Sequence, residues 1–175
     1  MTTQSRWKAE LHDSHAYREL AFVVDKTNYL EYTLKSILRK YLAAPSDRAA
    51  FVKDILLHSS IIGLGQKFKL LQFICEREQW PKLDPNSFHS VLNIRNAFAH
   101  SDTVTQIIKL SPRTNGKSEI AEVFQLVDSI SSSGKHKELK RSEALDEFVQ
   151  HWVAVRDYLH DIDTNYADKP SAKAI

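Results

Sequence analysis

The chain has few of the residues that break or cross-link a polypeptide. It contains one cysteine, Cys75, so no disulfide can form within the chain, and we expect a reducing compartment such as the cytoplasm. Glycine and proline number only 4 and 5 in 175 residues, which leaves long stretches free to form regular helices. The content of 42% hydrophobic and 26% charged residues is that of a folded globular domain and not of a disordered chain.

Two further absences narrow the class of function. The formal net charge is only +2, so the chain lacks the strong positive charge of proteins that coat nucleic acid, and any such contact must come from a local site. No apolar run is long enough to cross a membrane, and residues 1–7 lack the apolar core of a signal peptide. We therefore expect a cytoplasmic protein with no membrane partner.

Apolar residues recur at steps of three and four through most of the chain, which is typical of amphipathic helices. The spacing predicts helices over residues 14–42, 48–57, 66–79, 85–100 and from Ser142 onward. The fourth of these has a clear start signal, because Asp84 can cap its first turn and Pro85 suits the first helical position. Cys75 lies in an apolar stretch and is expected to be a small buried residue.

Two β-like runs separate the last two helices. Residues 103–110 and 120–130 flank a turn-rich segment, 111–117, and predict one β-hairpin. A lone hairpin is marginally stable in water, so this one should pack on the helices or on a second copy of itself. The basic run from Lys135 to Arg141 is predicted to be a solvated loop and first helical turn, with contact to a phosphate backbone as the alternative.

The predicted fold is therefore mainly α, a bundle of about five antiparallel helices with one inserted β-hairpin near 103–130. Residues 1–13 are expected to form an N-terminal segment, residues 14–165 the domain, and residues 166–175 a flexible tail.

One segment near the end of the fourth helix could carry chemistry: Arg95-Asn96-Ala97-Phe98-Ala99-His100. Histidine changes charge near neutral pH and can act as a general acid or base, and the planar guanidinium of arginine can bind two phosphate oxygens at once. Cleavage of RNA without a metal needs such groups: a base for the 2′-hydroxyl, an acid for the leaving oxygen, and a cation on the phosphate. Asn96 lies one turn before His100 on the same face and could orient the imidazole.

This segment resembles the Arg-x(4–6)-His motif of the HEPN superfamily, in its Arg-Asn-x-x-Ala-His form. The Arg–His spacing alone is common, and Arg6 and His12 have a similar one, so the resemblance depends on Asn96, Ala99 and the helical setting. Over residues 17–101 the layout is similar to that of mannitol operon repressor-like HEPN proteins. The resemblance implies a homodimeric, metal-independent endoribonuclease in a toxin–antitoxin or defence setting, with RNA as substrate and a protein antitoxin as partner. The alternative is a non-catalytic regulatory or protein-interaction module.

The expected catalytic residues are Arg95, Asn96 and His100, with no cofactor and no metal. Five residues along a helix turn through about 500°, which leaves Arg95 and His100 roughly 140° apart around the axis. Arg95 must curl round the helix, the helix must end early, or a second subunit must complete the site. The resemblance implies two such motifs across a two-fold axis. The carboxyl end of a helix favours a cation, which suits His100 to the role of acid.

The apolar stripe of the first helix passes through Thr27 and Glu31. A carboxylate on a buried face needs a partner, and Arg95 or His100 is the predicted one, which would make Glu31 a supporting residue of the site. The alternative is that Glu31 lies at the edge of the stripe and reaches water. The segment His12-Asp13-x-His15 has a chelating spacing, but no further ligand lies near it in the sequence, so no metal site is expected.

Overall fold

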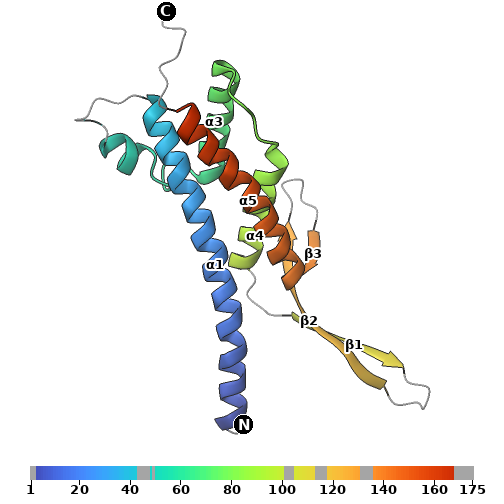
Figure 1. Cartoon of the computed structure of the whole chain (residues 1–175). Coiled ribbons are helices and arrows are strands. Elements are labelled where there is room, and N and C mark those ends of the chain that lie inside the picture. The colour runs from blue at the N-terminus through green and yellow to red at the C-terminus, as the bar shows by residue number, and fades with distance from the viewer. Residues whose placement is uncertain are drawn as a thin grey trace, which may run out of the picture. The chain divides into compact units, whose positions relative to one another are not determined.

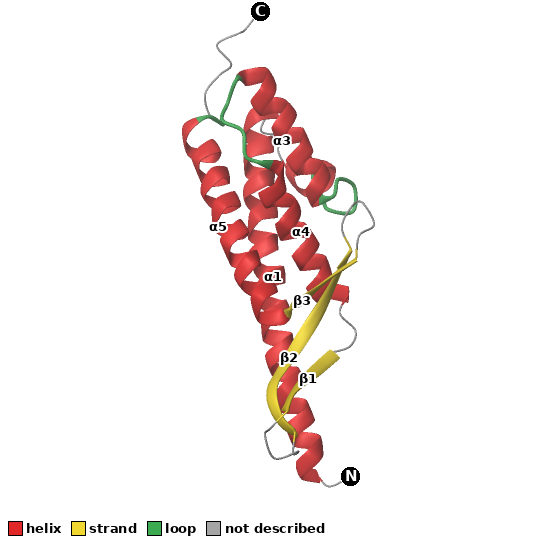
Figure 2. Ribbon diagram, turned by 90° about the vertical axis from the view of Figure 1, so that its right-hand side faces the viewer, coloured by secondary structure: helices red, strands yellow, loops and turns green. Residues whose placement is uncertain are grey.

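The computed structural model describes residues 3–42, 48, 50–100, 105–112, 118–130 and 136–167. The elements follow one another as α1 (Thr3–Leu42), η1 (Phe51–Leu56), α3 (Leu64–Glu78), α4 (Pro85–His100), β1 (Thr105–Pro112), β2 (Ser118–Ile130), β3 (His136–Lys140) and α5 (Arg141–Asn165) (Figure 1). Helices predominate in this part of the chain, and the strands form one antiparallel sheet (Figure 2). The predicted fold class, mainly α with an inserted β-hairpin, is confirmed.

The chain divides into two compact units, and each is discontinuous in the sequence. Unit 1 combines residues 1–25 with 89–150, and unit 2 combines residues 26–88 with 151–175. This division cannot be predicted from the amino-acid pattern, because α1, α4 and α5 each pass from one unit to the other without a break in the helix.

Unit 2 is built from the carboxyl-terminal part of α1, from α3 and from the carboxyl-terminal part of α5 (Figure 2). The indole Nε1 of Trp152 on α5 donates a hydrogen bond of 2.9 Å to the carbonyl of Lys26 on α1. The rings of Phe68 and Phe88 stack with centroids 3.8 Å apart. The buried apolar side chains of this unit include Leu30, Leu34, Ile37, Leu38, Leu57, Phe68, Leu71, Ile74, Cys75, Phe88, Val155, Leu159 and Ile162. The prediction that Cys75 is buried is confirmed.

The starts of α1 and α3 differ from the predicted ones, whereas the start of α4 agrees with the prediction. α1 begins at Thr3 and so includes most of the expected N-terminal segment. α3 begins at Leu64, two residues early, because the side chain of Gln66 accepts a hydrogen bond of 2.7 Å from the N–H of Gly63 and caps the first turn. α4 begins at Pro85 as predicted, and a carboxylate oxygen of Asp84 accepts from the N–H of Asn86 at 3.0 Å.

The predicted second helix, residues 48–57, contains a π-helix, η1, instead of a regular α-helix. The N–H of Leu57 bonds to the carbonyl of Val52, five residues earlier, at 2.9 Å. Such a ring is wider than an α-helical turn and is uncommon in proteins. The apolar spacing of this short segment is compatible with both kinds of helix, so the sequence could not distinguish them.

In unit 1 the predicted hairpin exists and is one strand larger than expected. β1 pairs with β2 in antiparallel register, and a bulge leaves Ala121 unpaired, since Lys109 faces Glu122 and Leu110 faces Ile120. β3 adds to the other edge of β2, with Val127 opposite Leu139. The prediction of a loop over the basic run is therefore wrong for residues 136–140. The signal was weak because this strand carries a single apolar residue among charged ones.

Both ends of α5 differ from the prediction by a small amount. The helix begins at Arg141, one residue before the predicted Ser142, directly after β3. At the other end, Tyr166 and Ala167 were assigned to the flexible tail, but Ala167 is buried and the ring of Tyr166 lies 5.9 Å from that of Trp80. The rest of the predicted tail, residues 168–175, lies outside the described residues.

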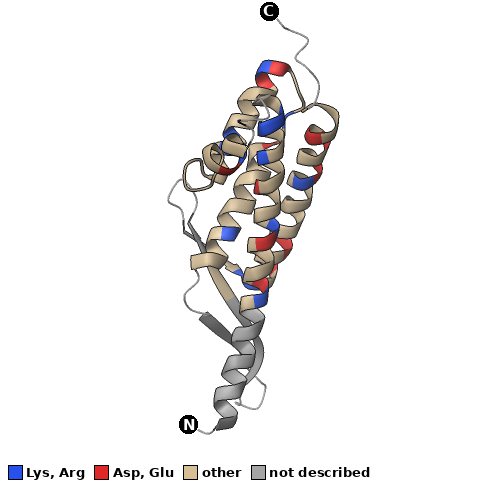
Figure 3. Ribbon diagram, turned by 90° about the vertical axis from the view of Figure 1, so that its left-hand side faces the viewer, with Lys and Arg blue, Asp and Glu red and all other residues tan. Residues whose placement is uncertain are grey.

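Charged residues of both signs occur along α1, α3 and α5 (Figure 3), whereas Arg95 is the only Lys, Arg, Asp or Glu residue of α4. Among the described residues, no helix has both the length and the apolar character needed to cross a membrane.

The stacked phenylalanine pair gives a test of the unit 2 core. We expect Phe68→Ala to lower the free energy of unfolding by about 3–5 kcal/mol, because it removes a buried ring and leaves a cavity beside Phe88. Urea denaturation followed by circular dichroism measures the loss. Phe73→Ala is the matched control on the same helix: its side chain is 61% exposed, and we expect a change within about 0.5 kcal/mol. Equal losses in the two variants would contradict the assigned core.

Candidate functional site

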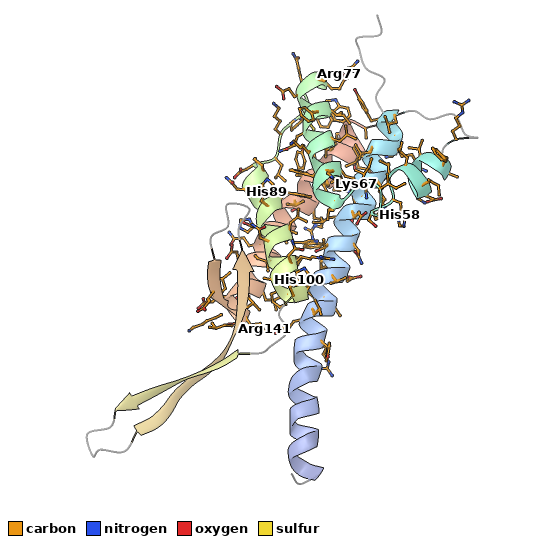
Figure 4. All side chains as sticks on the ribbon, turned by 180° about the vertical axis from the view of Figure 1, so that it is seen from behind. His58, Lys67, Arg77, His89, His100 and Arg141 are labelled. Atoms are coloured by element: carbon orange, nitrogen blue, oxygen red, sulfur yellow. The ribbon has the colours of Figure 1, made fainter. Side chains whose placement is uncertain are left out.

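Arg95, Asn96 and His100 all belong to α4, within its unit 1 portion. The helix runs without interruption through His100, which lies at its carboxyl-terminal end (Figure 4). Arg95 is half-buried, whereas Asn96 and His100 are exposed. Of the three arrangements that the spacing allowed, an early end to the helix is therefore wrong, and the separation of roughly 140° between Arg95 and His100 remains.

Asn96 contacts Arg95 and not His100. The guanidinium Nη1 of Arg95 donates a hydrogen bond of 3.1 Å to the amide oxygen Oδ1 of Asn96. This bond leaves the second lone pair of the oxygen and the amide nitrogen of Asn96 available, so the orientation of the imidazole by Asn96 stays a prediction.

The opposite face of α4 holds the motif in place. Ile94, Ala97 and Phe98 are buried and anchor this part of the helix in the core of unit 1. The guanidinium of Arg141 lies 4.6 Å from the ring centre of Phe98 and forms an ion pair with Glu19 of α1. Arg141 is itself buried and serves the packing behind the motif.

Sequence reasoning missed this role of Arg141. The local pattern places the residue at the end of a solvated basic run, because Lys135, Lys137 and Lys140 precede it in the sequence. The pairing with Glu19 joins residues more than a hundred positions apart, and nothing in the local pattern indicates it.

Glu31 belongs to unit 2, and its partners are lysines. One carboxylate oxygen lies 2.5 Å from the Nζ of Lys67 and 3.4 Å from that of Lys35. Lys67 has no exposed side-chain surface, whereas 16% of the Glu31 side chain is exposed. The prediction of a partner for this carboxylate is confirmed, but the predicted identity of the partner, Arg95 or His100, is wrong.

The ion pair also determines the protonation of Glu31. Burial on its own would raise the pKa of the carboxyl, but the hydrogen bond and the positive charge of Lys67, with the charge of Lys35, more than offset it. The pKa therefore lies below its ordinary value of 4.5. Glu31 is a carboxylate at neutral pH, and its role in the structure is to neutralise a buried ammonium.

Cys75 is buried and free of any disulfide. Burial raises the pKa of its thiol, and the sulfur lies 3.2 Å from the hydroxyl of Tyr158. The same hydroxyl donates to the carbonyl of Pro81 at 3.0 Å. Cys75 and Tyr158 thus form a part-buried polar contact between α3 and α5.

Among the side chains that the structure describes, no group of three or more His, Cys, Asp or Glu residues could hold a metal ion. The side chains of His12 and His15, the chelating pair considered above, lie outside that set.

No protein-family model matches the chain, and neither a curated protein nor a solved structure is significantly similar to it.

The Glu31 ion pair predicts a specific dependence of stability on pH. Because the pKa of Glu31 is lowered in the folded chain, its contribution is present above pH 4.5 and is lost as pH falls through the folded-state pKa. We expect Glu31→Gln to cost about 3 kcal/mol at pH 7, since Lys67 is then left buried without a counter-charge. The gap between wild type and variant should narrow below pH 4 in urea denaturation curves measured from pH 7 to pH 3.

Glu76→Gln is the control for this experiment. Its carboxylate is 69% exposed and lies 3.7 Å from Lys82, so we expect a change below about 0.5 kcal/mol. Wild type and Glu31→Gln curves that run parallel down to pH 3 would contradict the role assigned to the pair.

Proposed function

We propose that the chain is a metal-independent endoribonuclease of the HEPN type that acts as a homodimer. In this proposal Arg95 binds the scissile phosphate and His100 acts as the general acid or base. The observation that carries the proposal is the uninterrupted α4, which leaves Arg95 and His100 accessible on different sides of one rigid helix. It adds to the resemblance of residues 95–100 to the Arg-Asn-x-x-Ala-His motif.

The geometry of α4 favours a site shared by two chains. Side chains about 140° apart around one helix axis do not converge on a single phosphate without a large detour by the arginine. Two copies related by a two-fold axis solve this problem, because the His100 of each chain then faces the Arg95 of the other. The buried face formed by Ile94, Ala97 and Phe98 keeps each helix fixed while the two exposed edges meet.

The proposed chemistry uses the protein, the RNA and water. The 2′-oxygen attacks the adjacent phosphorus, its proton passes to a water molecule, and the bond from phosphorus to the 5′-oxygen breaks. His100, at the carboxyl end of α4, donates a proton to that leaving oxygen. Arg95 stabilises the additional negative charge on the phosphate in the transition state. The products are a 2′,3′-cyclic phosphate and a free 5′-hydroxyl.

Asn96 has a supporting role in this proposal. Its amide oxygen holds one nitrogen of the Arg95 guanidinium, which limits the freedom of a long side chain before substrate arrives. Glu31 has no direct role, since it neutralises Lys67 in unit 2.

One observation favours a second function, that of a non-catalytic interaction module. Unit 2 exposes several large apolar side chains, among them Phe51, Ile55, Ile61 and Phe73. Exposed apolar groups of this size are typical of surfaces that bind another protein. Under this alternative, binding of a protein partner would be insensitive to substitution of His100.

The nuclease proposal predicts the outcome of a histidine substitution. We expect His100→Ala to reduce the rate of RNA cleavage by 10²- to 10⁴-fold, roughly the contribution of a general acid, while cleavage by the wild type persists in EDTA. His89→Ala is the matched control, because His89 is an exposed histidine on the same helix (Figure 4). The assay measures cleavage of a labelled RNA and the appearance of cyclic phosphate ends. Equal rates in His100→Ala, His89→Ala and wild type would refute the nuclease proposal.

Mixing two inactive variants tests the shared site. Arg95→Ala and His100→Ala homodimers should each be inactive, but a mixed dimer retains one site with both wild-type residues. Equimolar subunits should therefore recover about a quarter of wild-type activity if each site takes one residue from each chain. A mixture as inactive as its components would show that Arg95 and His100 act within one chain.

A further inference from the structure

Unit 2 contains a pocket whose lining is strongly basic. Its walls are formed by Tyr32, Lys35, Ser36 and Arg39 of α1 and by Lys53 of η1. The α1 residues follow one another at steps of three and four along one face of the helix, and Lys53 completes the pocket from a separate element. Three cations, a hydroxyl and a phenol thus surround one small space.

The positive charge of this pocket is not neutralised within the described part of the chain. Lys35 lies 3.4 Å from a Glu31 oxygen, but that carboxylate also serves the fully buried Lys67 at 2.5 Å. Arg39 and Lys53 have no carboxylate partner among the described residues. Cations held this close repel one another, and an anion in the pocket relieves that repulsion.

The element that supplies Lys53 is unusual. η1 is a π-helix, closed by the bond from the N–H of Leu57 to the carbonyl of Val52, and such turns occur often at functional sites. The π-helix is therefore a second feature of the pocket, separate from its positive charge, that favours a binding site there.

The side chains identify the class of ligand. A guanidinium and two ammonium groups beside a hydroxyl match the oxygens of a phosphate group. Tyr32 is 64% exposed at the rim, and its ring offers a stacking surface for a base next to that phosphate. An acidic peptide would satisfy the cations, but it would leave the ring of Tyr32 without a matching group.

We propose that this basic pocket binds a phosphate of single-stranded RNA, with the adjacent base stacked on Tyr32. The inference rests on the proposed nuclease function for the choice of RNA, and it adds a substrate-binding subsite to it. A small basic pocket is consistent with the net charge of +2, because a chain of such low charge can contact nucleic acid only through a localised group of cations.

Binding to an RNA that cannot be cleaved tests the pocket apart from catalysis. The probe is a fluorescently labelled 2′-O-methyl octauridylate, which lacks the attacking hydroxyl, and fluorescence anisotropy gives its affinity at several salt concentrations. We expect Arg39→Ala/Lys53→Ala to weaken binding by about tenfold or more and to reduce the slope of log affinity against log salt by about 1.4. Tyr32→Ala should weaken binding several-fold with no change in that slope.

The control is Lys69→Ala/Lys82→Ala, which removes the same charge from exposed lysines of unit 2 that do not line the pocket. Circular dichroism confirms that each variant is folded. If the Arg39/Lys53 variant binds as tightly as this control, the proposal is wrong. If hexaglutamate binds as tightly as the octauridylate, or if Tyr32→Ala has no effect, the assignment to RNA is overturned.

The two proposals fail in different ways. Loss of cleavage in His100→Ala with unchanged binding in the pocket variants would overturn the pocket alone. Unchanged cleavage in His100→Ala with weaker binding in Arg39→Ala/Lys53→Ala would overturn the nuclease proposal and leave the pocket as a site for single-stranded RNA.

Discussion

Lys67 lies in the first turn of α3, and its side chain has no exposed surface. Its ammonium group must therefore be neutralised inside unit 2. Glu31 supplies that charge from α1, so the ion pair connects α1 and α3. The same carboxylate is shared with Lys35, which lines the basic pocket. The same ion pair thus affects both the packing of unit 2 and the charge of the basic pocket. Because Glu31 neutralises Lys67, the pocket keeps a net positive charge from Lys35, Arg39 and Lys53.

Much of the fold could be predicted because the physical signals are local. The start of α4 follows from Asp84 and Pro85, and the long apolar stripe of α1 gives a helix whatever surrounds it. The sequence does not reveal β3, because Leu139 is its only apolar residue and the pairing with β2 is not a local signal. The π-helix was missed because an extra residue in a turn leaves almost no trace in the spacing of a segment as short as η1.

The candidate site was predictable in its residue types but not in its contacts. The motif placed Arg95, Asn96 and His100 correctly on one helix, yet the partner of Asn96 is its immediate neighbour and the partner of Glu31 is a buried lysine. Lys67 could not be foreseen, since a lysine in an amphipathic helix is most often exposed. The basic pocket escaped notice for a different reason: α1 and η1 each carry ordinary numbers of charges, and only their packing brings Arg39 and Lys53 together.

The division of each unit between distant parts of the chain has a consequence for synthesis on the ribosome. Unit 1 needs residues up to 150, and unit 2 needs the segment from 151 onward, so neither can close until α5 has left the exit tunnel. Until then the apolar faces of α1 and α3 have no permanent cover. The chain up to residue 150 contains every residue of unit 1, whereas unit 2 is completed only by the part of α5 that follows, so unit 2 is the last of the two to be covered as the chain emerges.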